Sequence, residues 1–334
     1  MSKRALITGV SGQDGAHLAA LLLDKGYAVF GTSRDAELSG FANLTQLGIR
    51  DQVTTLSMAP NDFRSVLQAL DRAAVDEVYN LAGQSSVGLS FEQPVETLES
   101  IAIGSLNLLE AIRFLNRPIR LYNAGSSECF GDTGTTAANE ATAFRPRSPY
   151  AVAKATSVWQ VANYREAYGM FACSGILFNH ESALRPARFV TQKIARGVAD
   201  ILSGKRDHID LGALAIARDW GWAPEYVEAM YLMLQQDAPE DFVIATGETT
   251  TLQDYVAASF EAAALNWQDH VRHDETLVRP TDIKTSRGDP SKAATKLGWA
   301  AQTRMCDVTA RMVKAAIAVR MGEPPIDSSV EICK

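Results

Sequence analysis

The chain has 334 residues, a hydrophobic content of 46%, a charged content of 21% and a formal net charge of −7. These values are typical of a globular protein of one large or two ordinary domains, and they exclude a general nucleic-acid binder, which needs a basic face. No apolar run reaches the roughly 18 residues of a membrane span, and no signal-peptide core precedes the first strand-like run. Because the four cysteines are scattered, without metal-ligand spacing, we expect free thiols in the cytoplasm and no metal.

A glycine-rich turn stands between a strand-like and a helix-like segment near the start of the chain. Residues 4–8 are a short apolar run of buried-strand type, and residues 17–23 have helical spacing. The glycines between them, spaced G-x-x-G-x-x-G, let the backbone approach a pyrophosphate, which the positive end of a helix attracts. The alternative is a plain turn. We therefore expect a dinucleotide site at Gly9, Gly12 and Gly15.

The end of the second expected strand, residues 27–31, carries two opposing signals about that dinucleotide. An acidic side chain at this place holds the ribose 2′-hydroxyl of NAD, whereas an arginine accepts the 2′-phosphate of NADP. Arg34 therefore favours NADP. Asp35, which follows it, is the opposing signal unless it is merely solvated.

Strands and helices alternate as far as residue 178, which predicts a doubly wound parallel sheet. Further strands are expected at 52–56, 75–82, 119–124 and 174–178, and helices at 101–112 and 151–168. Ligands of such sheets bind beyond the carboxyl ends of the strands. Small polar residues after the fourth strand, and Ser126 to Glu128 after the fifth, stand at such ends.

Tyr150 and Lys154 are one helical turn apart, so their side chains share a face. A nearby cation favours a phenolate and lowers the pKa of a tyrosine. Tyr150 could then take a proton from a hydroxyl while a hydride leaves the same carbon. The spacing alone is weak, because an exposed tyrosine beside a solvated lysine would look the same.

The alternation becomes irregular from about residue 183, where arginines cluster. We expect an NADP-binding domain of residues 1–182 plus about 214–236, and a smaller substrate-binding domain of about 183–213 and 237–330. Within the returning segment, residues 218–220 are expected to form a strand-end loop and residues from 226 a helix.

Several segments, in order, carry a resemblance: the glycine turn, Ser90-Phe-Glu-Gln-Pro94, Arg147-Ser-Pro-Tyr150, Leu177-Phe-Asn-His-Glu-Ser182, Arg218-Asp-Trp-Gly221, 241–248 and Arg279-Pro-Thr281. Over nearly its whole length the chain resembles the GDP-mannose 4,6-dehydratases of the extended short-chain dehydrogenase/reductase family. The resemblance implies a Rossmann-type NAD(P)-binding sheet with a smaller C-terminal domain, bound NADP, a GDP-linked sugar as substrate, and a homodimer or homotetramer.

The resemblance also implies the roles of individual residues. Tyr150 would remove the proton from the sugar 4-hydroxyl with help from Ser126 and Lys154, and Glu128 would move the C5 proton and help the C6 hydroxyl to leave. The residues that match cofactor positions are Gly9, Ser11, Gly12, Gln13, Asp14, Gly15, Arg34, Leu81, Ala82, Gln84, Tyr150, Lys154, His180 and Arg185. Those that match substrate positions are Ser85, Ser126, Glu128, Tyr150, Asn179, Val190, Lys193, Arg218, Arg279 and Asp282.

Departures from the family's pattern leave alternatives open. A family threonine is Ser126 here, a second arginine is Asp35, an adenine-contacting aspartate is Ala59, a cofactor tyrosine is Glu96, and the loop at 211–217 differs. The alternatives are the same reaction on a GDP-manno-heptose, a related nucleotide-sugar 4-reductase or epimerase, and a non-catalytic NADP sensor. Glu128 favours the dehydratase, since a reductase or a C4 epimerase moves no C5 proton, and Cys129 is expected to pack under a strand end.

Overall fold

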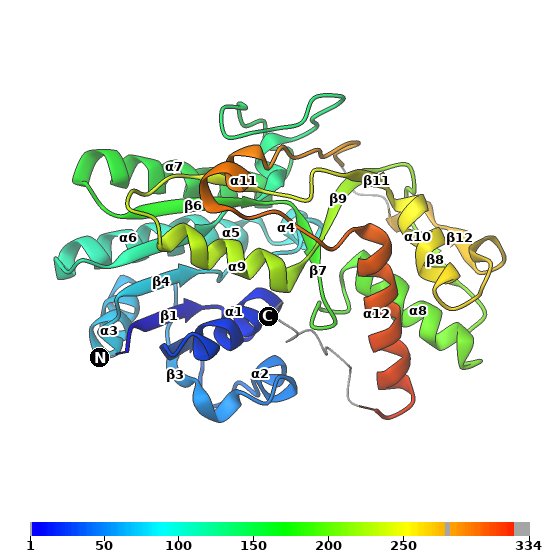
Figure 1. Ribbon diagram of the computed structural model, residues 1–334, viewed down its shortest axis with the longest axis horizontal. Coiled ribbons are helices and arrows are strands. Elements are labelled where there is room, and N and C mark those ends of the chain that lie inside the picture. Colours follow the sequence, from blue (N-terminus) through cyan, green and yellow to red (C-terminus); the bar gives the residue numbers. More distant parts are fainter. Residues whose placement is uncertain (1, 278–280, 324–334) are drawn as a thin grey trace.

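The computed structural model describes residues 2–277 and 281–323, and its larger part is built on one parallel sheet (Figure 1). The seven strands lie in the order β3-β2-β1-β4-β5-β6-β10, and every pairing among them is parallel. Their bounds are β1 (Arg4–Thr8), β2 (Ala28–Ser33), β3 (Thr54–Ser57), β4 (Glu77–Asn80), β5 (Arg120–Ala124), β6 (Ala172–Leu177) and β10 (Phe242–Ile244). This arrangement confirms the predicted doubly wound, Rossmann-type sheet.

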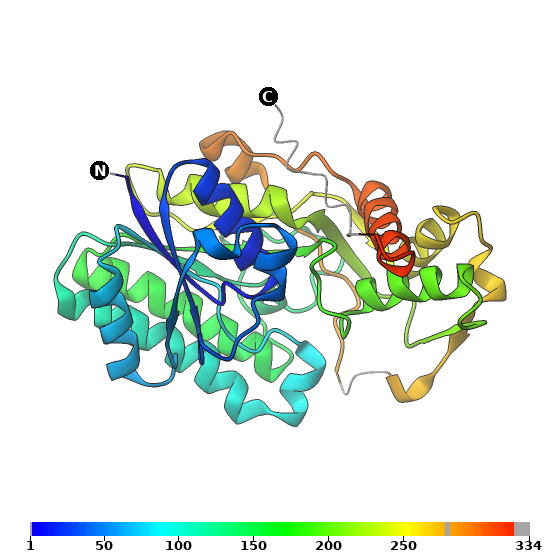
Figure 2. The ribbon, with the colours of Figure 1, turned by 90° about the horizontal axis from the view of Figure 1, so that it is seen from below.

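Helices cover both faces of the sheet, and Figure 2 shows the two layers on either side of the strands. One layer contains α1 (Gln13–Asp24), α9 (Ala223–Leu234) and α11 (Ser291–Leu297), and the other contains α3 (Phe63–Ala73), α6 (Gly104–Leu115) and α7 (Pro149–Tyr168). Strand β1 shows why its residues form a continuous apolar run: Ala5 and Ile7 pack in one hydrophobic cluster and Leu6 in the other. A strand that is buried on both faces carries apolar side chains on both.

A smaller part lies beyond the carboxyl ends of the strands. It holds a three-stranded sheet of β7 (Asn179–Glu181), β9 (Ala217–Trp222) and β11 (Thr249–Thr251), and a pair of β8 (Ile209–Leu211) and β12 (Val271–His273). Its helices are α8 (Val190–Leu202), α10 (Leu252–Glu261) and α12 (Met305–Arg320). Trp220, Trp222, Tyr255 and Phe260 form the centre of a separate hydrophobic cluster there.

Two expectations about the second half of the chain differ from the structure. Residues 218–220, expected as a loop, lie inside strand β9, which pairs with β7 and β11. Strand β10 and helix α11 fall in 237–330, yet β10 pairs with β6 in the large sheet and α11 packs on it. The chain therefore returns to the first sheet twice, once with α9 and β10 and again with α11. Among the described residues, no helix is both long and apolar enough to cross a membrane.

Candidate active site

A cavity of about 580 Å³ opens over the glycine turn, between the ends of β1, β2 and β4. Gly9 has a φ of +71°, which side chains rarely tolerate, and a Cβ on Gly15 would lie 2.4 Å from the carbonyl oxygen of Gly9. Gly12 is the N-cap residue of helix α1, and within the part of the chain that the structure describes no side chain caps the first turn of that helix. The backbone N–H groups and the positive end of α1 are thus left for an anion, as a dinucleotide pyrophosphate requires.

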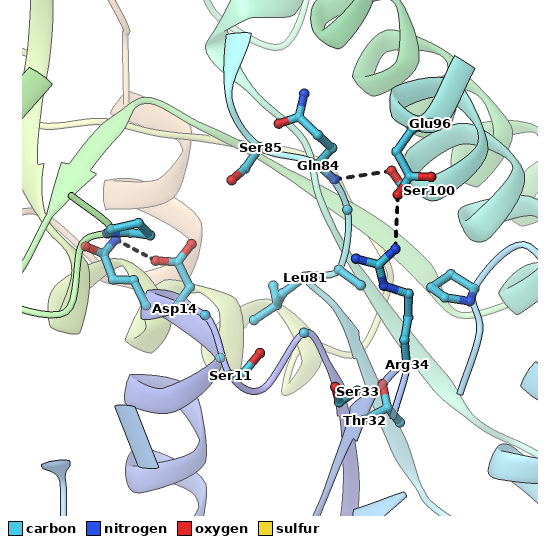
Figure 3. A pocket seen from close by; sticks show the side chains of 18 of the residues that line it. Ser11, Asp14, Thr32, Ser33, Arg34, Leu81, Gln84, Ser85, Glu96 and Ser100 are labelled. Atoms are coloured by element: carbon cyan, nitrogen blue, oxygen red, sulfur yellow. Dashed lines mark hydrogen bonds and ion pairs between the residues drawn. The ribbon is translucent and has the colours of Figure 1, made fainter. Parts of the chain in front are cut away.

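The two charged residues that follow β2 differ in whether they line this cavity. Arg34 lines the cavity, and its guanidinium lies near the carboxylate of Glu96 (Figure 3). Asp35 does not line the cavity, because its Oδ1 accepts hydrogen bonds from the backbone N–H groups of Glu37 and Leu38, both at 3.0 Å. Of these two charged residues, only the arginine therefore faces the cavity.

A second cavity of about 330 Å³ adjoins the first, and Asp14, Leu81, Ser85 and Arg185 line both. Ser126, Glu128, Tyr150 and Lys154, the four residues to which the sequence assigns catalysis, also line this second cavity. Two separate elements bring them there. Ser126 and Glu128 come from the end of β5, and Tyr150 and Lys154 come from the first turns of α7.

Helix α7, which carries Tyr150 and Lys154, has a well-defined N-terminus. Ser148 is the N-cap residue and accepts a hydrogen bond from the N–H of Ala151 at 3.1 Å, and Pro149 follows at the first helical position. The Lys154 Nζ donates to the carbonyl oxygen of Ala124 at 2.7 Å and lies 6.0 Å from the centre of the Tyr150 ring. The lysine thus ties the helix to the end of strand β5.

The expectation that Lys154 lowers the pKa of Tyr150 is not what the structure shows. Burial raises the pKa of Tyr150 well above its usual value, while a hydrogen bond with Ser126 and the more distant charge of Arg185 oppose that rise. Burial likewise lowers the pKa of Lys154 from 10.5 to about 8. Both groups therefore sit in a site that disfavours charge, and any phenolate must form during the reaction itself.

Glu128 and Cys129 lie in a 3-10 turn, Ser127–Phe130, that follows the end of β5. The hydroxyl of Ser126 caps this turn, accepting a hydrogen bond from the N–H of Glu128 at 3.3 Å. Glu128 is half-buried and lines the cavity, whereas Cys129 is fully buried and does not. Burial raises the pKa of the Cys129 thiol to about 12, so it is a packed and unreactive side chain.

His180 and Asp14 form an ion pair beside both cavities. His180 Nδ1 lies 2.7 Å from the carbonyl oxygen of Phe178, and Nε2 lies 3.0 Å from Oδ2 of Asp14. Both ring nitrogens face acceptors, so the imidazole binds them best when it carries two protons. Burial lowers the pKa of His180, but the charge and hydrogen bond of Asp14 outweigh burial and raise it. The pKa of Asp14 is lowered correspondingly, although burial alone would raise it.

Comparison with known proteins shows the family of this chain. A family model for GDP-mannose 4,6 dehydratase matches residues 6–312. GDP-mannose 4,6 dehydratase 1 of Arabidopsis thaliana is 45% identical over 307 residues, which cover 89% of this chain and 85% of the relative. The GDP-mannose 4,6-dehydratase of Vibrio cholerae is 42% identical, with 96% and 95% covered.

This chain belongs to the GDP-mannose 4,6-dehydratase family. The predicted class of enzyme, a nucleotide-sugar 4,6-dehydratase, is thereby confirmed.

Solved structures of other nucleotide-sugar enzymes share the fold of this chain. The UDP-glucose 4-epimerase of Thermus thermophilus, in complex with NAD, is 25% identical with a TM-score of 0.81, covering 94% of this chain and 99% of the epimerase. The dTDP-glucose 4,6-dehydratase DesIV of Streptomyces venezuelae, with NAD bound, is 21% identical with a TM-score of 0.83, covering 96% and 98%. The NAD in the epimerase agrees with the coarser expectation of a nicotinamide cofactor.

The structure places nearly all the expected site residues of this family member around the two cavities. The first cavity is lined by Gly9, Ser11, Gly12, Gln13, Asp14, Gly15, Arg34, Leu81, Ala82, Gln84, Ser85 and Arg185. The second is lined by Ser85, Ser126, Glu128, Tyr150, Lys154, Asn179, His180, Arg185, Val190, Lys193 and Arg218. Asp282 does not line it but accepts a hydrogen bond from Arg218 at 3.0 Å. Arg279 lies outside the described residues.

Sequence reasoning missed Glu181, which holds Arg185 in place. Glu181 is 1% exposed; its Oε2 accepts a hydrogen bond from Thr191 at 2.7 Å and lies 3.1 Å from Nε of Arg185. The Arg185 guanidinium also stacks on Phe189, with 3.8 Å between its Cζ and the ring centre. Glu181 stands in the polar Asn179-to-Ser182 segment that follows the apolar strand β6, so a charged residue just beyond a buried strand was the available signal.

Proposed function

We propose that this family member converts GDP-mannose to a GDP-4-keto-6-deoxy sugar, using NADP as the nicotinamide cofactor. The observation that carries the proposal is the meeting of Ser126, Glu128, Tyr150 and Lys154 in one cavity that adjoins a dinucleotide-sized one. The choice of NADP is supported by Arg34, which faces the first cavity while Asp35 is engaged in its own loop. The second part of the fold would then bind the nucleotide end of the substrate.

Tyr150 is the proposed base for the sugar 4-hydroxyl. In its buried place the neutral phenol is favoured, so Tyr150 must lose its proton in step with the chemistry, and Ser126, hydrogen-bonded to it, can share that proton. A nicotinamide bound beside Tyr150 would supply the acceptor for the hydride of C4 and the donor of that hydride to C6. Lys154, with its pKa lowered to about 8, is the group that can stabilise the phenolate or contact the cofactor ribose.

Glu128 is the proposed acid and base for the elimination of water. A 4-keto group makes the proton on C5 acidic, and the carboxylate can accept that proton and pass one to the departing C6 hydroxyl. The 3-10 turn holds Glu128 at the cavity wall, fixed to Ser126 by the backbone hydrogen bond. Dehydration needs such a group in addition to Tyr150, because two different atoms, the oxygen of the 4-hydroxyl and C5, each lose a proton.

The proposed nucleotide end of the site is basic. Lys193 and Arg218 line the second cavity on the side of α8 and β9, together with Asn179 and Val190. Arg218 is 3% exposed and is oriented by the carboxylate of Asp282. A buried arginine with a fixed guanidinium suits a diphosphate, because two of its N–H groups can bind two oxygens at once.

The test combines the bound cofactor with the product. The purified protein is denatured and the released dinucleotide identified, and the native protein is incubated with GDP-mannose and, separately, with GDP-manno-heptose. We expect NADP(H), and a GDP-mannose product lighter by one water. Dehydration of the heptose alone would transfer the proposal to the other sugar, and an unchanged or merely epimerised sugar would overturn it. A cytoplasmic location and a homodimer or homotetramer remain predictions, and light scattering would determine the oligomer.

A further inference from the structure

The first cavity ends between two side chains of opposite charge. Arg34 follows strand β2, and Glu96 lies in the first turn of another element, α5 (Pro94–Leu98). Both side chains line the cavity. The Nη1 of Arg34 and the Oε1 of Glu96 are 3.4 Å apart, and Figure 3 shows the two side chains reaching toward each other. The side chains are 79% and 46% exposed. An ion pair that long and that exposed contributes little stability, so either partner can turn to a ligand.

The acid that commonly ends the second strand of a dinucleotide-binding sheet is engaged elsewhere. Asp35 stands next to Arg34, but its Oδ1 accepts two backbone hydrogen bonds of its own loop and it does not line the cavity. Glu96 is the carboxylate that does line this end of the cavity, facing Arg34 from another element. The expected site of the adenosine ribose therefore lies between an arginine that follows β2 and a glutamate of α5.

We propose that Glu96 is a specificity-determining residue, which accepts a hydrogen bond from the ribose 2′-hydroxyl of NAD and repels the 2′-phosphate of NADP. The inference rests on the proposed nicotinamide cofactor. With both side chains at the same end, Arg34 favours the phosphorylated dinucleotide by its charge and Glu96 favours the unphosphorylated one by its hydrogen bond. The chain then binds both dinucleotides, with a modest preference for NADP.

Electrostatics sets the size of the expected effect. A ribose phosphate carries about 1.5 to 2 negative charges at neutral pH, like a phosphorylated side chain. Two anions that share one guanidinium stand roughly 6 Å apart, and in water their repulsion weakens binding by roughly fivefold to tenfold. Since the pair is exposed, this penalty shrinks as salt is raised toward about 0.5 M.

The test measures binding and not turnover. Affinities of NADP+ and NAD+ are determined by calorimetry on the dinucleotide-free full-length protein, for wild type, Glu96→Gln and Glu92→Gln. Glu92 is the matched control, because it is an exposed glutamate at the end of α4 (Val87–Glu92) that lines neither cavity. We expect Glu96→Gln to bind NADP+ roughly fivefold to tenfold more tightly and NAD+ several-fold more weakly at low salt, and Glu92→Gln to match wild type.

Three results would overturn the inference. The first is a Glu96→Gln variant that changes both affinities by the same factor or changes neither. The second is wild-type protein that binds NAD+ more than about 100-fold more weakly than NADP+, since Glu96 would then contribute no preference. The third is Arg34→Gln that leaves NADP+ affinity intact, since the charge opposite Glu96 would not face the phosphate. Wild-type protein that binds neither dinucleotide overturns the proposed function itself, so the two failures are distinguishable.

Discussion

Replacing Lys154 by methionine should make the dinucleotide-free protein more stable while removing its activity. The pKa of Lys154 falls from 10.5 to about 8 because burial penalises the charged amine, and at about 1.4 kcal/mol per pKa unit this costs about 3 kcal/mol of folding free energy. The variant loses the hydrogen bond to the Ala124 carbonyl, which costs about 1–2 kcal/mol. The expected net gain at pH 7 is therefore about 1–2 kcal/mol.

The sign of this gain depends on pH. Below about pH 8 the lysine is charged in both the folded and the unfolded chain, so the full penalty acts on the wild type. Between pH 8 and 10.5 the folded lysine is neutral and the unfolded one still charged, so the penalty fades, and the advantage of the variant should disappear by about pH 10. Lys314→Met, at an exposed position of α12, is the matched control and should change stability little at either pH.

Urea unfolding at pH 7 and pH 10, followed by tryptophan fluorescence, measures these free energies. A Lys154→Met variant that is less stable than wild type at pH 7, or whose advantage does not change with pH, would refute the burial argument. A variant that is more stable at pH 7 but not at pH 10 would mean that the chain keeps a lysine that destabilises its fold because the reaction needs it.

Three further predictions concern single side chains. Glu128→Gln keeps the shape but accepts no proton, so dehydration should fall by about 10²-fold or more while reduced nicotinamide accumulates on the enzyme, visible by its absorbance; normal dehydration would remove Glu128 from the mechanism. Tyr150→Phe should lose turnover without any reduced cofactor appearing, and wild-type formation of reduced cofactor would assign the base to another group, with Ser126 the next candidate. Iodoacetamide at pH 8 should label Cys306, which is exposed, and spare Cys129, which is buried with a pKa raised to about 12. Mass spectrometry identifies the labelled cysteines, and a label on Cys129 in the folded protein would contradict its packing role.

Local pattern was enough to predict the elements that carry the site. The bounds of β1 match the expected run, because a strand buried on both faces is apolar through its interior, here from Ala5 to Ile7. The expected helix 151–168 is α7, which begins two residues earlier, at Pro149, because Ser148 and Pro149 form a typical N-cap pair. These features depend on neighbours in sequence alone.

Pairings between distant segments could not be read in the same way. Strand β10 has three residues and pairs with β6, more than sixty residues earlier, so nothing in its own sequence separates it from the neighbouring second part. The altered pKa of Tyr150 is a further case. Spacing predicts that a lysine is near, but the direction of the pKa change depends on burial, which several elements produce together.

The measurement that tests the central claim most directly follows one hydrogen atom through the reaction. GDP-mannose carrying deuterium at C4 is incubated with the protein, and the product is examined by mass spectrometry and NMR. The account predicts a product that has lost one water and carries the deuterium at C6, because the hydride taken from C4 is held in the site and returned to the same sugar. Deuterium that stays at C4, washes into the solvent or leaves on released reduced cofactor would contradict the proposed internal hydride transfer.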